Sequence, residues 1–377
     1  MTPRIPGLSR RTALRSVAGI GALAVGPTAC TEPDVTEPAA PPSSRRFGAE
    51  WEPQARTFMS WPTVAIWGPD IGEVQRDIAG LARAVAAHQP VVLLTAPDLV
   101  GAARNAAGSG VEVVPIPVND LWARDTVPVF VEQDGEIAGV DLNFNGWGDK
   151  QHPHDADHAA GPALLKRYGI PRITTWLVGE GGALETDGQG TLLVTESSLV
   201  NENRNPGRSR SDIEAELRAL LGVTQIIWFA GVRGEDITDA HVDFLVRFTG
   251  PGAVLLDRAF PGTEPDVWSR SADEAAAVLA DATDARGAKL AVTALTQPDP
   301  DRITGRGDEF VSTYLNFSVA DGAVFVPTFG DAAADDNAVQ VFRDHFPGRE
   351  IVQLGIDAIA SGGGGIHCAT HDQPASA

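Results

Sequence analysis

The feature that most constrains the fold is a unit that occurs four times between residues 125 and 326. Each unit begins with a polar residue, continues with an apolar run, turns at a glycine and ends with a second apolar run. Such runs around a short turn predict β-hairpins, most strongly where the turn reads Asp-Gly. The four turns are Asp134-Gly135, Asp187-Gly188, Pro251-Gly252 and Asp321-Gly322.

The turn glycines stand 53, 64 and 70 residues apart, which is typical of a radially repeated architecture. Helix-like stretches follow the hairpins at 158–168, 210–221, 271–285 and 334–345. Upstream, the strand-like runs Val91–Thr95 and Val111–Ile116 alternate with helical patterns over 71–87 and 97–107. We therefore expect an α/β fold in which these amino-terminal strands and the Cys368 segment supply a fifth unit.

The polar residues that begin the hairpins occupy the same place in every unit. In a radial fold, residues at this place converge on the centre. They are Asp125, Glu180, His241 with Asp243, and Asn316, and Cys368 holds the corresponding place in the fifth unit. The alternative is that they are unconnected strand caps, but the recurring position favours a shared site.

The segment around Cys368 favours a nucleophile. Four glycines at 362–365 precede it, so the backbone there can approach another group closely and adopt positive φ angles. His367 and His371 flank the cysteine, and a cationic imidazole would favour the thiolate over the thiol. The alternative is a structural cysteine, because free cysteine is common in protein cores.

The first thirty residues predict an export signal. Paired arginines at 10–11, a weakly apolar run over 17–25 and the Ala29-Cys30 pair match a twin-arginine signal peptide, with Cys30 as a candidate lipidation site. An uncleaved basic arm is the alternative. Residues 31–46 are rich in Pro, Glu, Ala and Ser, which predicts a disordered linker and leaves 47–377 as a single domain. We expect a cell-envelope or extracellular protein, exported through the twin-arginine pathway.

Charge and motifs exclude several classes of function. The net charge is −21, or −24 without residues 1–46, which argues against nucleic acid as a partner and mildly favours a cationic small substrate. The body has no long apolar run that predicts a transmembrane segment. Walker, dinucleotide-binding and Gly-x-Ser-x-Gly motifs are absent from the sequence. The sequence gives no oligomeric state.

Histidines and aspartates crowd one short stretch, a pattern that could bind a metal adventitiously. They are His152, His154, Asp155, Asp157 and His158. The Pro- and Gly-flanked setting indicates a surface loop, so we predict neither a metal nor another cofactor. The residues expected at the centre also lack the second cysteine that would favour zinc.

The remaining chemistry is that of a cysteine nucleophile with a histidine acid/base. Carboxylates that face a thiolate are electrostatically unfavourable unless the substrate brings positive charge. A guanidinium is planar, always cationic and pairs bidentately with carboxylates. The residues therefore indicate a guanidine-modifying enzyme rather than a protease.

A series of short motifs lies in one order over residues 47–374. It comprises Trp51-Glu-Pro53, Trp61-Pro62, Asn119–Asp125, Asn143–Gly148, Glu180–Asp187, Glu196, Asn201–Pro206, Thr238–Asp243, Tyr314–Phe317, Phe329–Asp331 and Gly362–Cys368. Together these motifs resemble the agmatine deiminase / bacterial peptidylarginine deiminase family of the guanidine-modifying superfamily. The resemblance implies a five-bladed α/β propeller of the pentein type, with pseudo-fivefold ββαβ-type repeats around a central active site, which agrees with the repeats described above. It also implies a single deiminase catalytic domain.

The resemblance also implies a role for each central residue. Cys368 would be the nucleophile and His241 the general acid/base, with Asp125 and Asp243 holding the guanidinium. Glu180 would contact the guanidinium or His241. Trp122 and Asn316 would be further pocket residues, although a core aromatic and a strand cap explain them equally well.

Three functions are then open. The first converts agmatine and water to N-carbamoylputrescine and ammonia through a covalent thiouronium. The second is the related reaction on peptidyl or free arginine, which gives citrulline and suits an exported protein. The third is an exported, non-catalytic guanidine-binding lipoprotein, which would need neither the thiol nor the imidazole. Departures from the family pattern at Gly365, Phe244 and Ile237–Ala240 put the choice of substrate in doubt.

Overall fold

The computed structural model describes residues 44–303, 306–307 and 309–376. The predicted signal peptide, and the predicted linker up to residue 43, lie outside the described residues. Arg45 and Arg46, which the prediction assigned to the linker, form β1 (Arg45–Arg46) against β5 (Val129–Gln133). The first sheet therefore begins at Arg45 rather than after residue 46. Among the described residues, no helix combines the length and apolar character needed to cross a bilayer.

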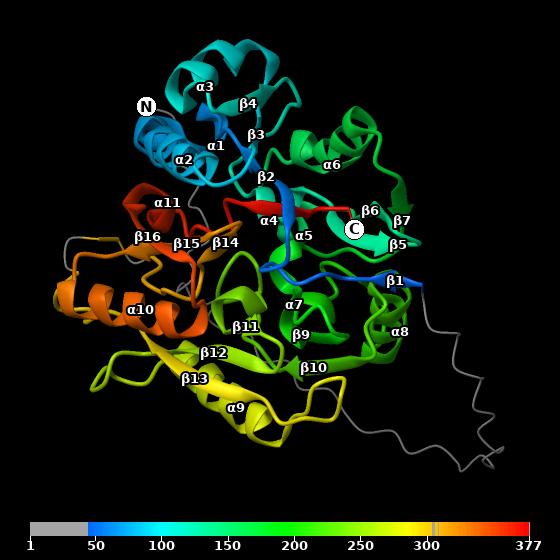
Figure 1. The fold of residues 1–377 in the computed structure, drawn as a ribbon, viewed down its shortest axis with the longest axis vertical. Coiled ribbons are helices and arrows are strands. Elements are labelled where there is room, and N and C mark those ends of the chain that lie inside the picture. Colours follow the sequence, from blue (N-terminus) through cyan, green and yellow to red (C-terminus); the bar gives the residue numbers. More distant parts are fainter. Residues whose placement is uncertain (1–43, 304–305, 308, 377) are drawn as a thin grey trace, which may run out of the picture.

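Five small sheets surround a common centre, and Figure 1 shows the chain passing from one to the next around the ring. Four sheets share an antiparallel hairpin and a third strand parallel to the second strand of the hairpin, and β1 adds a fourth strand to the first of them. These strands are β5, β6 (Glu136–Asp141) and β7 (Arg172–Thr174); β8 (Glu185–Thr186), β9 (Thr191–Thr195) and β10 (Gln225–Phe229); β11 (Val246–Gly250), β12 (Ala253–Arg258) and β13 (Ala291–Thr296); and β14 (Ser318–Ala320), β15 (Ala323–Thr328) and β16 (Glu350–Gly355). The predicted five-bladed α/β propeller and its four hairpins are confirmed.

The fifth blade joins the two ends of the chain, as predicted. β17 (His371–Pro374) pairs antiparallel with β2 (Gln54–Ser60), so that His371 lies opposite Phe58. β3 (Val91–Leu94) and β4 (Val111–Val114) then continue this sheet in parallel. The segment that carries Cys368 thereby enters the centre of the ring immediately before its last strand.

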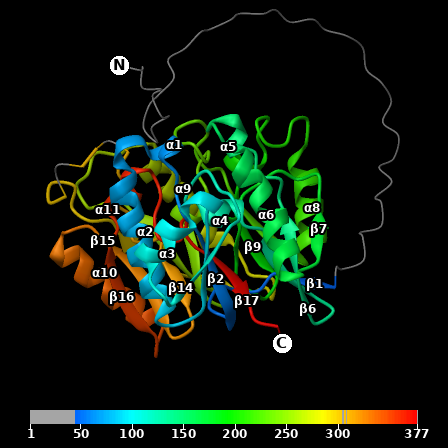
Figure 2. The ribbon, with the colours of Figure 1, turned by 90° about the horizontal axis from the view of Figure 1, so that it is seen from above.

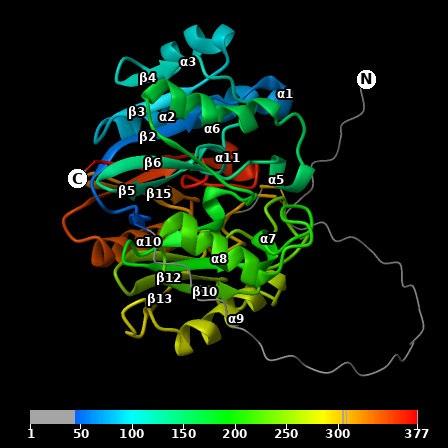
Figure 3. The ribbon, with the colours of Figure 1, turned by 90° about the vertical axis from the view of Figure 1, so that its right-hand side faces the viewer.

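The long helices lie on the outside, with α3 at one end and α9 at the other in Figure 3. They are α2 (Ile71–Ala86), α3 (Val100–Ala107), α6 (Asp155–Tyr168), α8 (Arg210–Leu221), α9 (Val267–Asp281) and α10 (Ala332–His345). Each lies near a predicted helix. α9 begins and ends four residues before the predicted stretch, because Asp266 and Ser269 form a capping box at its start.

Helix α2 illustrates how the outer helices are held. Its predicted apolar positions Val74, Ile78, Leu81 and Val85 are all buried against the core. Full burial of one such side chain stabilises a fold by roughly 1.5–3 kcal/mol. The sheets are thus covered from outside, and the inner strand ends face the centre.

A short helical turn precedes the first strand of three blades and carries polar side chains to the centre. These turns are α4 (Ala123–Thr126) before β5, η3 (Gly181–Ala183) before β8 and η4 (Val242–Phe244) before β11. The remaining short helices are α1 (Val64–Trp67), η1 (Gly68–Asp70), η2 (Pro97–Leu99), α5 (Gly146–Asp149), α7 (Glu196–Leu199) and α11 (Asp357–Ser361). In Figure 2, α1 and α5 lie at one edge of the molecule, and β6 and the C-terminal end lie at the opposite edge.

Candidate active site

The residues predicted from the hairpin starts come together at the centre of the ring. Asp125, Glu180, His241, Asp243, Asn316 and Cys368 are all buried there. The backbone of Gly182 shows how closely three of them approach. A Cβ atom on this glycine would lie 2.6 Å from His241 Nδ1, 3.0 Å from Asp125 Oδ1 and 3.2 Å from Asp243 Oδ2. Side chains from two blades therefore meet against the backbone of a third.

Cys368 is held beside Asp243 by Asn316. The amide of Asn316 donates from Nδ2 to Asp243 Oδ2 at 3.2 Å and to Cys368 Sγ at 3.3 Å, and its Oδ1 accepts from the Cys368 backbone N–H at 3.2 Å. The sulfur lies 3.7 Å from Asp243 Oδ2. Asn316 is thus more than a strand cap, because it fixes the position of both neighbours.

His241 lies between two carboxylates. Its Nε2 is 3.2 Å from Glu180 Oε2, and its Nδ1 is 3.8 Å from Asp125 Oδ1. Burial alone would lower the pKa of His241, but the negative charge of Asp125 and the hydrogen bond and charge of Glu180 raise this pKa to about 9. The imidazole is therefore protonated at neutral pH and can act as an acid.

Glu180 also contacts Arg204, whose Nε donates to Glu180 Oε1 at 2.9 Å. Arg204 donates in addition to Asp239 Oδ2 from Nη1 at 2.7 Å. Burial raises the pKa of Glu180, but the charge of Arg204 and the bond to His241 outweigh this effect and hold the pKa below its usual value. The predicted contact of Glu180 with His241 is observed, and a contact with the guanidinium stays a prediction.

Asp125 accepts hydrogen bonds on both of its oxygens. Its Oδ1 accepts from the Gly182 N–H at 3.1 Å, and its Oδ2 accepts from Trp147 Nε1 at 2.9 Å. Burial raises the pKa of Asp125, and the charges of Glu180 and Asp243 raise it further against the opposing effect of His241. The neighbouring positive charge, from His241, is therefore too little to offset the burial of ionised Asp125 and the repulsion from the other carboxylates.

Asp243 differs from Asp125 because one of its two oxygens accepts no hydrogen bond from the described residues. Its Oδ2 is crowded by Asn316, Cys368 and the imidazole of His367, whose Nδ1 lies 2.8 Å away. Its Oδ1 is buried and has no hydrogen-bond partner among the described residues. Burial raises the pKa of Asp243, but the bond to His367 and its charge lower it overall, so Asp243 is ionised. A buried, ionised oxygen without a donor points to a ligand that supplies one.

The glycines before Cys368 have the predicted purpose of close approach. A Cβ on Gly364 would lie 2.1 Å from the ring of Trp122, and a Cβ on Gly365 would lie 2.5 Å from Asn316 Oδ1. Gly363 adopts a φ of +87°, which other residues avoid. Side chains at these positions would displace either Trp122 or the amide that holds Cys368. Trp122 is buried, and its part in binding stays a prediction.

The two histidines that flank Cys368 lie in different surroundings, and His371 differs from the prediction. Burial, followed by the charge of Arg124, holds the pKa of His371 well below its usual value, and its Nδ1 lies 2.9 Å from the Arg124 carbonyl. His371 is therefore neutral, and the prediction of a cationic imidazole was wrong for it. His367 lies between two carboxylates, with Nδ1 on Asp243 and Nε2 3.1 Å from Glu50 Oε2.

A cavity of about 350 Å³ adjoins the site at His241. This volume lies in the usual range of small-molecule sites, roughly 300–1,000 Å³. Aromatic walls come from Phe244, Phe260, Trp268 and Phe310, and five carboxylate residues line the same cavity. These are Asp236, Asp257, Glu264, Asp266 and Glu309. Among the described lining residues there is no lysine or arginine, so the cavity favours cations.

A family model described as Porphyromonas-type peptidyl-arginine deiminase matches residues 46–374. The chain belongs to this family. It is 36% identical to the agmatine deiminase of Medicago truncatula, with 87% of this chain and 96% of that one covered. It is also 36% identical to the agmatine deiminase of Stutzerimonas stutzeri, with 87% and 95% covered.

A solved structure shares the fold. It is the agmatine deiminase of Enterococcus faecalis, which matches with a TM-score of 0.82 at 30% identity. The match covers 89% of this chain and 97% of that chain. The peptidyl-arginine deiminase family, together with these relatives, places the chain among amidine hydrolases that modify guanidines.

The sequence did not predict two residues that hold the central carboxylates in place. Trp147 and Arg204 fall in the motifs Asn143–Gly148 and Asn201–Pro206, but neither was given a role. The signal for Trp147 is its backbone, because a φ of +53° is unfavourable for a bulky residue and only the fold reveals it. Arg204 is a fully buried arginine, which a linear motif cannot show.

Proposed function

We propose that the chain hydrolyses agmatine to N-carbamoylputrescine and ammonia through a thiouronium on Cys368. The observation that carries this proposal is the placement of the Cys368 sulfur beside ionised Asp243, whose second oxygen has no donor in the described part of the chain. A bound guanidinium supplies that donor. It also places positive charge beside the sulfur, which favours the thiolate. The agmatine deiminases among the relatives support the same substrate.

In the first half-reaction, the Cys368 thiolate forms a bond to the guanidinium carbon while Asp125 and Asp243 hold the nitrogens. Protonated His241 then gives its proton to one terminal nitrogen. The bond from carbon to that nitrogen breaks and ammonia leaves. The product is a cationic S-alkylthiouronium on Cys368, with His241 now neutral.

In the second half-reaction, neutral His241 takes a proton from water as the oxygen bonds to the thiouronium carbon. The carbon–sulfur bond breaks, and the thiolate departs. The ureido product loses the remaining proton, which the released ammonia takes up in solution. Cys368 and protonated His241 are thereby restored, with Glu180 and Arg204 holding the imidazole in place.

The cavity favours agmatine over free arginine. The second charge of agmatine is an ammonium group, which the five carboxylate residues attract. Free arginine carries a carboxylate, which the same walls repel. Peptidyl-arginine lacks this carboxylate and is the second candidate, because the matching family model carries that name. A non-catalytic binding protein leaves the Cys368–His241 pair unexplained.

The test is ammonia release from agmatine, arginine and a blocked arginyl peptide, with Cys368→Ala as control. We expect release to be fastest from agmatine and to be lost in the variant. Glu264→Gln should lower kcat/KM for agmatine about two- to fivefold, the scale of one exposed charge pair. Glu274→Gln, on α9 but outside the cavity lining, is the matched control. Equal release of ammonia by wild type and Cys368→Ala contradicts the mechanism. Faster release from the peptide than from agmatine would make peptidyl-arginine the preferred substrate.

We further propose that the chain is exported through the twin-arginine pathway to the cell envelope or the exterior, with Cys30 lipidated. The order of the paired arginines, the apolar run and Cys30 in the sequence supports this proposal. Fractionation of cells that express the full chain tests this proposal. Replacement of Arg10 and Arg11 by lysine should retain the protein in the cytoplasm, and Cys30→Ala should abolish acylation. An unchanged distribution contradicts export by this route.

A further inference from the structure

Residues 146–154, which comprise α5 and the residues after it and are called the 146–154 loop below, bring together three potential metal ligands that the proposed reaction does not use. They are Asp149, His152 and His154, and one ligand atom from each lies within 4.8 Å of the others. The sequence assigned these histidines to a surface loop. The structure places Asp155 at the start of helix α6 and buries Asp157 completely, so the stretch is more ordered than that interpretation implied.

The distances among these atoms suit a small divalent ion. Asp149 Oδ1 lies 3.2 Å from His152 Nε2 and 3.3 Å from His154 Nε2. Bonds of roughly 2.0–2.2 Å to a tetrahedral zinc ion set neighbouring ligand atoms roughly 3.3–3.5 Å apart. Two edges of the triangle therefore already have nearly the required length. The exposure of Asp149 and His152 leaves a path for an ion to enter.

His154 is held so that one particular nitrogen faces Asp149. Its ring packs edge-on against Phe144 at a centroid distance of 6.4 Å, and a Cβ on Gly146 would collide with it. Its Nδ1 is buried without a hydrogen-bond partner in the described part of the chain, whereas Nε2 faces Asp149. Packing against Phe144 and Gly146, together with the contact of Nε2 with Asp149, thus orients this imidazole, and Nε2 is the atom offered to a ligand.

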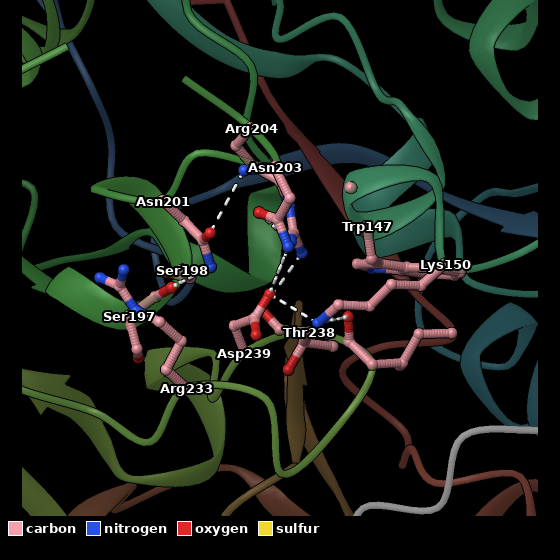
Figure 4. A network of polar contacts seen from close by, with 12 residues as sticks. Trp147, Lys150, Ser197, Ser198, Asn201, Asn203, Arg204, Arg233, Thr238 and Asp239 are labelled. Atoms are coloured by element: carbon pink, nitrogen blue, oxygen red, sulfur yellow. Dashed lines mark hydrogen bonds and ion pairs between the residues drawn. The ribbon is translucent and has the colours of Figure 1, made fainter. Parts of the chain in front are cut away.

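The same loop is connected to the candidate active site at two points. Trp147, two residues before Asp149, donates to Asp125. Lys150, the next residue after Asp149, contacts Asp239 Oδ2 at 2.6 Å, and Figure 4 shows Arg204 meeting the same carboxylate. An ion on Asp149 would therefore restrain a segment that lies between Asp125 and the Arg204–Glu180 pair.

We propose that Asp149, His152 and His154 bind one divalent transition-metal ion of the zinc type, which closes the 146–154 loop. Two imidazoles and one carboxylate suit such ions, whereas Ca²⁺ and Mg²⁺ prefer sites made of oxygen ligands. Three protein ligands leave the fourth tetrahedral position to water. The site holds the loop and takes no part in the attack of Cys368.

The test is a calorimetric titration of chelator-treated, tag-free protein with Zn²⁺. It is carried out in the Cys368→Ala background, so that the thiol cannot compete for the ion. We expect one Zn²⁺ per chain, and affinity at least about tenfold weaker in His152→Gln. His88→Gln is the matched control, because His88 also faces a carboxylate, Glu350 at 3.8 Å, and lies outside the three-ligand cluster. It should bind Zn²⁺ like the parent.

Hydrogen exchange gives a second readout. Bound Zn²⁺ should slow exchange of the amides of residues 146–154 in the parent and leave their exchange unchanged in His152→Gln. Unfolding curves show that the variants are folded. Equal affinity of parent and His152→Gln, or weak binding of several ions that His88→Gln also reduces, means adventitious binding and overturns the proposal.

Discussion

The molecule contains two buried groups of charges that solve the same electrostatic problem differently. The arginine cluster consists of Glu50, Arg124, Glu185, Arg247 and Asp372, and its carboxylates face guanidinium groups of the protein itself. Arg247 Nε lies 3.0 Å from Glu185 Oε2, and Arg124 Nη1 lies 3.1 Å from Asp372 Oδ1. The thiol cluster consists of Asp125, Glu180, His241, Asp243 and Cys368. There, Asp125 and Asp243 have no arginine or lysine within ion-pairing distance in the described part of the chain.

The contrast shows which group is missing from the thiol cluster. Buried carboxylates are costly unless they are paired, and this protein pairs others with its own arginines. Asp125 and Asp243 instead have an indole, an amide and imidazoles as partners. The position that a resident guanidinium would fill is left for one that the substrate brings. His367 joins the two clusters, since it contacts Asp243 with one nitrogen and Glu50 with the other.

The largest expected effect is that of Cys368→Ala, which separates turnover of agmatine from binding of agmatine. Cys368→Ala removes the nucleophile and leaves the carboxylates in place, so ammonia release should fall at least about 10⁴-fold. Agmatine should still bind, because the attraction of the thiol cluster for a guanidinium does not depend on the sulfur. Steady-state kinetics and calorimetry measure the two quantities. Loss of binding together with turnover would mean that Cys368 shapes the pocket.

Neutralising one carboxylate in each cluster tests the contrast directly. Asp125→Asn should lower kcat/KM for agmatine by about 10²- to 10³-fold, because a buried charge partner of the substrate is lost. Glu50→Gln should lower the free energy of unfolding by about 3 kcal/mol, because it removes one of the two carboxylates that pair with buried Arg247.

The pKa shifts give the sign of each effect on stability. Although burial raises the pKa of Glu50, the charges of Arg247, His367 and Arg124 hold it well below its usual value, so ionised Glu50 stabilises the fold. The pKa of Asp125 is raised, so the negative charge of Asp125 does not stabilise the fold. Denaturant unfolding should therefore show a smaller loss in Asp125→Asn than in Glu50→Gln. The reverse order would contradict the comparison.

Trp147→Phe tests the weaker donors that replace arginine in the thiol cluster. The change removes the indole N–H on Asp125 and keeps an aromatic ring. A hydrogen bond to a charged group contributes about 1.5–3 kcal/mol, so kcat/KM should fall by about 10- to 100-fold. Trp228→Phe, in β10 and away from Asp125, is the matched control. Equal losses in both variants would assign Trp147 to packing alone.

The two clusters should also respond differently to pH. His241 has a pKa of about 9, raised above its ordinary 6.5. Its proton is needed for the departure of ammonia, so kcat/KM for agmatine should fall about tenfold per pH unit above 9, whereas arginine pairs keep their charge there. Because the folded-state pKa is raised, the stability contributed by protonated His241 is complete below about pH 6.5 and is lost between pH 6.5 and 9. A pH profile of kcat/KM that is flat to pH 10 would exclude His241 as the acid.

The sequence predicts the fold and the central residues because both depend on repetition. The turn at Asp134-Gly135 and its three counterparts define the blades, and the residue before each hairpin then falls at the centre. The ββαβ repeat that the family resemblance implies includes a third strand, but this strand, such as β7 or β10, carries no such turn, and its residues were not located from the sequence. The partners of the central residues were missed for a different reason. Trp147 and Arg204 reach Asp125 and Glu180 from distant loops, and no pattern along the chain encodes such contacts.

The most direct test of the account is the intact mass of wild-type enzyme quenched by acid during turnover of agmatine. We predict a transient species heavier by the mass of agmatine less ammonia, located on the Cys368 peptide and absent from Cys368→Ala. Steady ammonia release from an enzyme whose Cys368 remains unmodified at every quench time would contradict it.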